Sequence, residues 1–104
     1  MLSRAEFQVL LALADGPKHG RGIKVDVRTR TNGEIDMGPG TLYGAIKRLL
    51  RRRWIAEVTD SVPDVEDDRL RYYAATHDGL EAAREEALRT ASLVGIAQTK
   101  RLIG

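Results

Sequence analysis

The stretch from Met37 to Ile55, MGPGTLYGAIKRLLRRRWI, decides the fold of this chain. A Gly-Pro-Gly turn leads into residues with helical spacing of the apolar positions. Cations crowd the second half of the stretch: Lys47, Arg48, Arg51, Arg52 and Arg53. No acidic residue lies between Asp36 and Glu57, although a solvated helix ordinarily balances its cations with glutamates. The stretch therefore predicts a helix whose exposed side is unusually basic.

The two sides of this helix separate cleanly at about 100° per residue. One side is aliphatic and predicts contact with a core: Leu42, Ala45, Ile46 and Leu49. The other side begins with residues that lack a side chain and continues with cations: Gly40, Gly44, Lys47, Arg48 and Arg51. Thr41 and Tyr43 stand at the two borders between these sides.

Two helices are expected before this stretch. Ser3 and Glu6 form a capping-box pair, which predicts a helix over 5–14. Its apolar residues form two faces, one with Phe7, Leu10, Leu11 and Ala14 and one with Leu2, Val9 and Leu13. A second helix is expected over 19–29, followed by a stop at Thr31-Asn32-Gly33. A short strand is expected over 34–37, ahead of the third helix.

Two strands and a long helix are expected after the stretch. The β-branched and aromatic residues of 54–59 and 70–76 predict a hairpin. The polar segment 61–68 between them is long for a hairpin loop, and we expect it to be mobile. Thr76 then caps a helix reaching to about Leu102, too long for the small preceding domain to cover.

The composition limits the functions that are open to the chain. Its 104 residues suffice for one domain, and it has no cysteine for a disulfide or a thiolate metal site. It has no apolar run long enough to span a membrane and no signal-peptide core, so we expect a cytoplasmic protein that makes no membrane contact. His19 and His77 lack partners at metal-ligand spacing and are expected in turns or caps, so no cofactor is predicted.

The order of elements is that of a winged helix-turn-helix, in which the third helix is the recognition helix and the hairpin is the wing. The fold class predicted is mainly α with a small β-hairpin. A DNA-binding domain over 1–76 is expected to be followed by a long C-terminal dimerisation helix over 77–104.

The chain also resembles the PadR family of transcriptional regulators, in the short form with a single C-terminal helix. The resemblance is carried by LADGPKHG at 13–20, GPGTLY at 38–43, KRL at 47–49, and Tyr72-Tyr73 leading to Thr76 and Gly79. It implies that Tyr43 lies at or beside the DNA interface. It also leaves open a small, flat apolar effector held between subunits.

Two positions depart from the family pattern. The family has glycine before the first wing strand, where this chain has Arg53. Either Arg53 adopts a left-handed conformation, at a cost of about 1 kcal/mol relative to glycine, or the helix runs on by one residue. The family also prefers an aromatic residue where this chain has Arg21, which bears on the packing of the second helix.

We therefore expect a regulator that binds double-stranded operator DNA. Gly40 and Gly44 permit close approach to the major groove, and Thr41 with the first-turn N–H groups can meet a phosphate. Lys47, Arg48 and Arg51 can reach phosphates or base edges, and Arg69 and Arg71 can do so from the wing.

A dimer is expected because the final helix carries an uncovered apolar stripe. We predict that it pairs with the second face of the partner's first helix, using Leu2, Val9, Leu13, Leu80, Ala83, Ala87, Ala91 and Val94. The expected activity is that of a dimeric repressor on an inverted-repeat operator.

Two other classes of protein compete with this one. The alternative is a winged-helix module that binds protein and not nucleic acid, but such a module would show an apolar or acidic third helix. An enzyme is not expected, because the sequence has no nucleophile-base pair and no phosphate loop. Cation binding by the acidic run 64–68 stays open.

Overall fold

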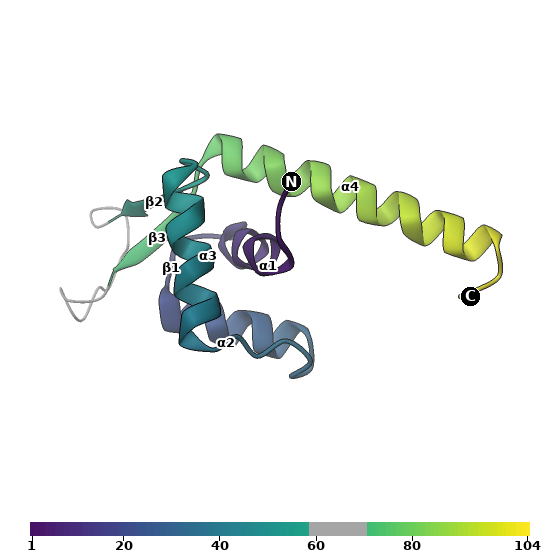
Figure 1. Cartoon of the computed structure of the whole chain (residues 1–104), viewed down its shortest axis with the longest axis horizontal. Helices are drawn as coiled ribbons and strands as arrows, with labels where there is room; N and C mark the ends of the chain where they lie inside the picture. Colours follow the sequence, from purple (N-terminus) through teal and green to yellow (C-terminus); the bar gives the residue numbers. More distant parts are fainter. Residues whose placement is uncertain (59–70) are drawn as a thin grey trace.

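The computed structural model describes residues 1–58 and 71–104. Its first three helices pack together, with a small sheet at one edge and one long helix reaching outward (Figure 1). The helices are α1 (Arg4–Leu13), α2 (Gly20–Arg30), α3 (Pro39–Arg51) and α4 (His77–Thr99), and the strands are β1 (Lys18–His19), β2 (Ile55–Val58) and β3 (Tyr72–Ala75). This confirms the winged helix-turn-helix, with α3 as the third helix and β2 and β3 as the wing. The expected loop 61–68, Arg69 and the acidic run 64–68 lie outside the described residues.

The sheet has three strands, but its third strand is β1 and not the short strand expected at 34–37, where the structure has none. Its order is β1-β3-β2 and both pairings are antiparallel. Lys18 pairs with Tyr73, and Ile55 pairs with Ala75. The strand β1 is only two residues long, too short to produce an alternating pattern, and the sequence places His19 at the start of a helix. In the structure His19 is the N-cap of α2, and its Nδ1 accepts a hydrogen bond from the Gly22 N–H at 3.0 Å.

The helix α1 lies at the centre of the core, in contact with α2, α3 and α4. Its buried side carries Val9, Leu10, Ala12 and Leu13, which meet Ile23, Val27, Leu42, Ala45, Ile46, Leu49 and Ile55 from the other elements. Phe7 and Leu11 are only partly buried, and Ala14 is exposed.

This packing corrects the expectation for three of the residues assigned to the partner-facing side of α1. Leu2, Val9 and Leu13 are 8%, 0% and 3% exposed within the single chain. The chain's own elements therefore cover the face that was expected to be free. Leu10, assigned to the other face, is fully buried with them, so the two faces do not separate as the sequence predicted. The partly open face is the one with Phe7 and Leu11.

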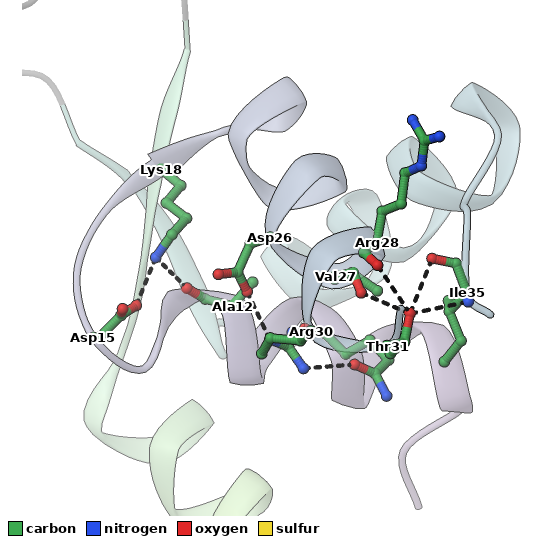
Figure 2. Close-up of polar contacts among 10 residues, drawn as sticks. Ala12, Asp15, Lys18, Asp26, Val27, Arg28, Arg30, Thr31 and Ile35 are labelled. Carbon is green, nitrogen blue, oxygen red and sulfur yellow. Dashed lines mark hydrogen bonds and ion pairs between the residues drawn. The ribbon is translucent and has the colours of Figure 1, made fainter. Parts of the chain in front are cut away.

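Side-chain hydrogen bonds to the backbone fix the ends of α1 and α2 (Figure 2). The Lys18 ammonium donates to the Ala12 carbonyl near the end of α1 and pairs with Asp15 at 2.6 Å. The Thr31 hydroxyl donates to the Val27 carbonyl at 2.8 Å and accepts from the Ile35 N–H at 3.0 Å. These bonds tie the segment that leads into α3 to the end of α2.

The backbones of α3, β2 and α4 meet closely at Arg53 and Trp54. Arg53 has φ of 60°, so it adopts the left-handed conformation and the helix does not run on. The N–H groups of Arg53 and Trp54 bond to the carbonyls of Leu50 and Leu49, which is the Schellman pattern of a helix end. The arginine therefore carries a cost that glycine would avoid.

The first turn of α4 closes against this junction. The Thr76 hydroxyl donates to the Arg53 carbonyl at 2.8 Å, and the Thr76 N–H donates to the Trp54 carbonyl at 3.0 Å. A Cβ atom on Gly79 would lie 1.9 Å from the Trp54 carbonyl oxygen. Gly79 and Ala83 are buried, so the first two turns of α4 share the core of the preceding elements.

We predict that Gly79→Ala lowers the free energy of unfolding by roughly 1–3 kcal/mol, because the added methyl group forces the helix away from a backbone carbonyl. Gly40→Ala is the matched control, since no atom of the described residues lies within 4 Å of a Cβ built there. The control should keep or slightly raise the stability, as alanine favours a helix more than glycine does. Urea unfolding of both variants without DNA measures the difference. Equal stabilities would contradict the close packing at Gly79.

Candidate nucleic-acid interface

The exposed side of α3 carries the small and basic residues that the sequence placed there. Gly40, Lys47 and Arg51 are exposed, and Gly44 is half-buried. A Cβ on Gly44 would meet only the Arg48 guanidinium, at 3.4 Å. The opposite side buries Leu42, Ala45, Ile46 and Leu49, as predicted. We call the face defined by Gly40, Gly44, Lys47 and Arg51 the basic face. It has no side chains at its two glycines near the helix start, and cations follow them.

The N-terminus of α3 is open to a ligand. Gly38 is the N-cap, Pro39 occupies the first turn, and no side chain among the described residues caps the helix. The first-turn N–H groups are therefore free to meet an anion at the positive end of the helix dipole. Thr41 is exposed in this turn and can add its hydroxyl group.

Tyr43 lies beside this helix start and leans on α2. Its side chain is 52% exposed, yet a Cβ on Gly20 would come within 2.6 Å of its hydroxyl oxygen. Gly20 therefore gives the tyrosine ring room against the first turn of α2. Tyr43 joins Pro39, Arg21 and Lys24 in lining a shallow hollow between the two helices.

Arg21 and Lys24 extend the positive charge from α3 onto α2, and the sequence pattern did not single them out as DNA contacts. Arg21 is exposed, whereas Lys24 faces Asp36 at 3.7 Å. In the sequence both are outward-facing residues of an ordinary amphipathic helix. The signal that could have found them is their place near Gly20, where the family-like motif at 13–20 ends.

Arg48 and Arg52 turn toward a buried carboxylate on α1. The Glu6 side chain is 4% exposed, and its Oε2 lies 3.7 Å from the Arg48 Nε and 3.8 Å from the Arg52 Nη1. Its Oε1 accepts from the Ser3 N–H at 2.8 Å, and the Ser3 hydroxyl accepts from the Glu6 N–H, which confirms the capping box. Arg48 thus stands at the edge of the basic face, next to α1.

The environment of Glu6 favours the charged carboxylate. Burial alone raises the pKa of a carboxyl group, but hydrogen bonds from Ser3 and the charges of Arg52 and Arg48 outweigh it, and the pKa of Glu6 lies below its ordinary value of 4.5. By contrast, Lys47 and Arg51 form no ion pair within 1–58 and 71–104.

The wing contributes one described cation. Arg71, just before β3, faces Glu57 of β2 at 3.5 Å, and its side chain is 75% exposed. Tyr73 beneath it is 5% exposed, and burial together with the nearby Glu57 charge raises the pKa of its hydroxyl. Arg69, the other wing residue selected from the sequence, lies outside the described part of the chain.

The stripe selected on α4 is only partly exposed. Ala83 is 7% exposed and belongs to the chain's own core, which corrects its assignment to an uncovered surface. Beyond it α4 leaves the body of the molecule (Figure 1), and Ala87 and Ala91 are exposed. Large apolar side chains stay accessible along and beyond this helix: Leu80, Leu88, Leu93, Val94, Ile96, Leu102 and Ile103.

We predict that Glu6→Gln removes an acid-dependent part of the stability. A carboxyl group whose folded pKa is depressed stabilises the fold at pH values well above 4.5 and loses that contribution as the pH falls through the folded pKa. The variant should be less stable near pH 7, by on the order of 1 kcal/mol, and should approach the wild type in acid. Urea unfolding from pH 7 to pH 3 measures this.

The control for this prediction is Glu34→Gln, since Glu34 is exposed and has no ion pair with any described residue. A Glu6→Gln curve that runs parallel to the wild-type curve at all pH values would contradict the role given to Glu6.

Comparisons with known proteins agree on one architecture. A transcriptional regulator from Clostridium thermocellum has a TM-score of 0.75 at 19% identity, over 95% of this chain and 97% of that one. A PadR family transcription regulator from Clostridium difficile has a TM-score of 0.75 at 18% identity, over 93% and 97%. RosR of H. salinarum has a TM-score of 0.68 at 22% identity, over 88% and 76%. At these identities the likeness shows the fold.

A sequence relative is known from a mobile element. The chain is 36% identical over 91 residues to an uncharacterized 37.1 kDa protein of transposon TN4556 from Streptomyces fradiae. The match covers 88% of this chain but 24% of that protein, so the chain spans about a quarter of the length of this relative.

The model of the transcriptional regulator PadR-like family matches residues 9–85. The match runs from α1 through α3 and the wing into the first turns of α4, the part of the chain that contains the basic face. Proteins of this family regulate transcription and are not enzymes. The chain therefore belongs to the PadR-like family of transcriptional regulators.

Proposed function

We propose that this protein regulates transcription by binding double-stranded DNA with α3 in the major groove. The observation that carries the proposal is the basic face: Gly40 and Gly44 lie beside Lys47 and Arg51, and neither cation is paired within the described residues. The major groove is about 12 Å wide and admits a helix only where its leading side chains are small. Two glycines at this position meet that requirement.

The contacts then divide by position along α3. The open helix start and Thr41 suit a phosphate, because free N–H groups and the dipole both favour an anion there. Lys47 is nearer the start that enters the groove, so we assign it to base edges. Arg51 is one turn further and is assigned to a phosphate. Arg71 on the wing and Arg21 on α2 can reach the backbone on either side of α3.

Tyr43 belongs to the interface at its border. Its ring is held against Gly20 while half of its surface stays accessible. It can therefore contact sugar or phosphate with little loss of side-chain freedom on binding.

A protein-binding role is the alternative function. A winged helix that binds protein would present apolar or acidic residues on α3, whereas the face observed here is glycine and cation. Most of the exposed large apolar side chains among the described residues lie instead on α4 or just after it, and α4 extends away from α3 (Figure 1). That separation supports one surface for DNA and another for a second copy.

The proposed second copy covers the distal half of α4. In this half Val94 is 42% exposed, and Ala87 and Ala91 are exposed on the same side of the helix. Leu80, 40% exposed, continues the same side into the first turn of α4. Exposed apolar stripes of this kind mark interaction sites. Phe7 and Leu11 on the partly open side of α1 replace Leu2, Val9 and Leu13 as its contacts in the partner. A two-fold dimer of this kind is expected to recognise an inverted repeat and to repress by occupying it.

For an effector, we propose only a chemical class and a place. A flat apolar molecule could sit between the subunits, as the family resemblance implies, but α4 contains no aromatic residue that would stack on it. Neither a cofactor nor a metal ion is part of the proposal.

We predict that Lys47→Ala and Arg51→Ala both weaken binding to a duplex selected in vitro, in different ways. Loss of a phosphate contact at Arg51 should weaken binding to all duplexes alike. It should also lower the salt slope, the steepness with which the logarithm of the binding constant falls with the logarithm of the salt concentration, by about one unit. Loss of a base contact at Lys47 should cost about 1–3 kcal/mol and relax the preference at one symmetric pair of positions. Lys100→Ala, at the far end of α4, is the charge-matched control. If the double variant bound with unchanged affinity and slope, the assignment of the basic face would be wrong.

We predict that Ala91→Glu dissociates the dimer, whereas Arg89→Glu does not. Both residues are exposed in the single chain, but they point about 160° apart on α4, and only Ala91 lies on the stripe with Ala87 and Val94. Burying the new carboxylate in an interface should weaken the dimer at least ~10-fold. Sedimentation equilibrium of both variants measures this. A monomeric wild type at micromolar concentration, or equal behaviour of the two variants, would refute the proposed interface.

A further inference from the structure

The carboxylate of Glu6 is the one buried side-chain group in the described residues whose polar atom lacks a hydrogen-bond partner. Glu6 is 3% exposed, and its Oε2 accepts no hydrogen bond within the described chain. A buried anionic oxygen without donors is costly unless cations stand close by. The cations that face it are Arg48 and Arg52, at 3.7 and 3.8 Å.

Both arginines come from the same end of α3, and each has a reason to stay near α1. Arg48 lies on the border of the basic face that turns toward Glu6. Arg52 is the C-cap of α3, and its guanidinium also lies over the Trp54 ring, 4.9 Å from the centroid. A cation over an indole ring is attracted by the ring as well as by the carboxylate. Glu6 and Trp54 therefore hold Arg52 from two sides.

These arginines are held but not enclosed. The Arg48 and Arg52 side chains are 47% and 41% exposed, so each could reach outward if the carboxylate charge were removed. Once the carboxylate charge is gone, a DNA phosphate near the end of α3 is the anion that these long, partly exposed side chains can reach.

We propose that Glu6 is an internal counter-ion of α3: it neutralises Arg48 and Arg52, so that these arginines do not bind DNA phosphates. The affinity for DNA is then set by Lys47 and Arg51. The inference rests on the proposed DNA binding by α3. It moves Arg48 from the DNA contacts expected from the sequence to a group whose charge is already balanced inside the chain. Glu6 touches no DNA in this scheme and acts only by positioning the arginines.

The consequence is weaker non-specific binding, that is, a lower affinity for DNA of any sequence. Affinity for any duplex rises with the number of phosphates that cations neutralise, and each contact adds about 0.9 to the salt slope. Two balanced arginines lower that sequence-independent part and leave base contacts untouched. Glu6 thereby lowers the absolute affinity for DNA but raises the ratio of specific to non-specific binding.

The test is the salt dependence of binding by Glu6→Gln, measured on the full chain with the selected duplex and with a scrambled duplex. The introduced amide keeps an oxygen that can accept from the Ser3 N–H, so the start of α1 is retained while the charge is lost. The slope should become steeper by about 1–2 units on both duplexes, and the scrambled duplex should be bound several-fold more tightly at low salt. Glu85→Gln, an exposed residue of α4, changes the net charge equally and is the control.

Arg48→Gln supplies a second, independent measurement. It should leave the slope unchanged when Glu6 is present and should lower the slope by about one unit in the Glu6→Gln background. A purely structural role for Glu6 would weaken binding without steepening the slope. Thermal melting of each variant confirms that the compared chains are folded at the assay temperature.

The outcomes separate this inference from the function on which it rests. If the wild type binds DNA with a slope that depends on Lys47 or Arg51, but Glu6→Gln is no steeper than Glu85→Gln, the counter-ion role is overturned and DNA binding stands. If Arg48→Gln lowers the salt slope while Glu6 is present, the counter-ion role is overturned as well. A wild type that binds no duplex overturns both.

Discussion

The carbonyl groups of Arg53 and Trp54 fix the geometry of the whole chain. Arg53 ends α3 in a left-handed conformation, and the Trp54 carbonyl receives the Thr76 N–H and lies against Gly79 in the first turn of α4. The end of the third helix, the start of the wing and the start of the last helix therefore meet at one point. The direction of α4 relative to α3 is set there, by contacts too close to allow sliding.

That fixed direction matters because the two ends of the molecule have different tasks in the proposed function. The basic face of α3 is to enter a groove, while the distal half of α4 is to meet a second copy. In a two-fold dimer held by α4, the separation of the two α3 helices follows from the angle at the junction. Two recognition helices must stand about one DNA turn, ~34 Å, apart to read adjacent major grooves. In the proposed dimer, a rigid junction would transmit the dimer geometry to the DNA.

The sequence predicted most of the architecture, and the glycine and cation positions of α3, because its strong local signals agreed with one another. The capping box at Ser3, the split faces of α3 and the cap at Thr76 each act within a few residues, and each was confirmed. Features decided by contacts between distant segments gave no such signal. The two-residue strand β1 carries no period, and a helix with two apolar faces does not say which face the chain's own elements cover. Glu6 was expected to cap a helix, but no pattern placed its second oxygen beside α3.

Glu6 takes part both in a local interaction, the cap of α1, and in a contact with a distant segment, the end of α3. One carboxylate oxygen closes the first turn of α1, and the other faces arginines at the C-terminal end of α3. Because the same group serves both helices, the register of α1 and the charge offered by α3 cannot change independently. A shift of α1 that kept its cap would remove the anion from Arg48, and a shift that kept the ion pairs would open the cap. In the proposed function, this sharing would let the residue that caps α1 also set how much of the charge of α3 is available to DNA.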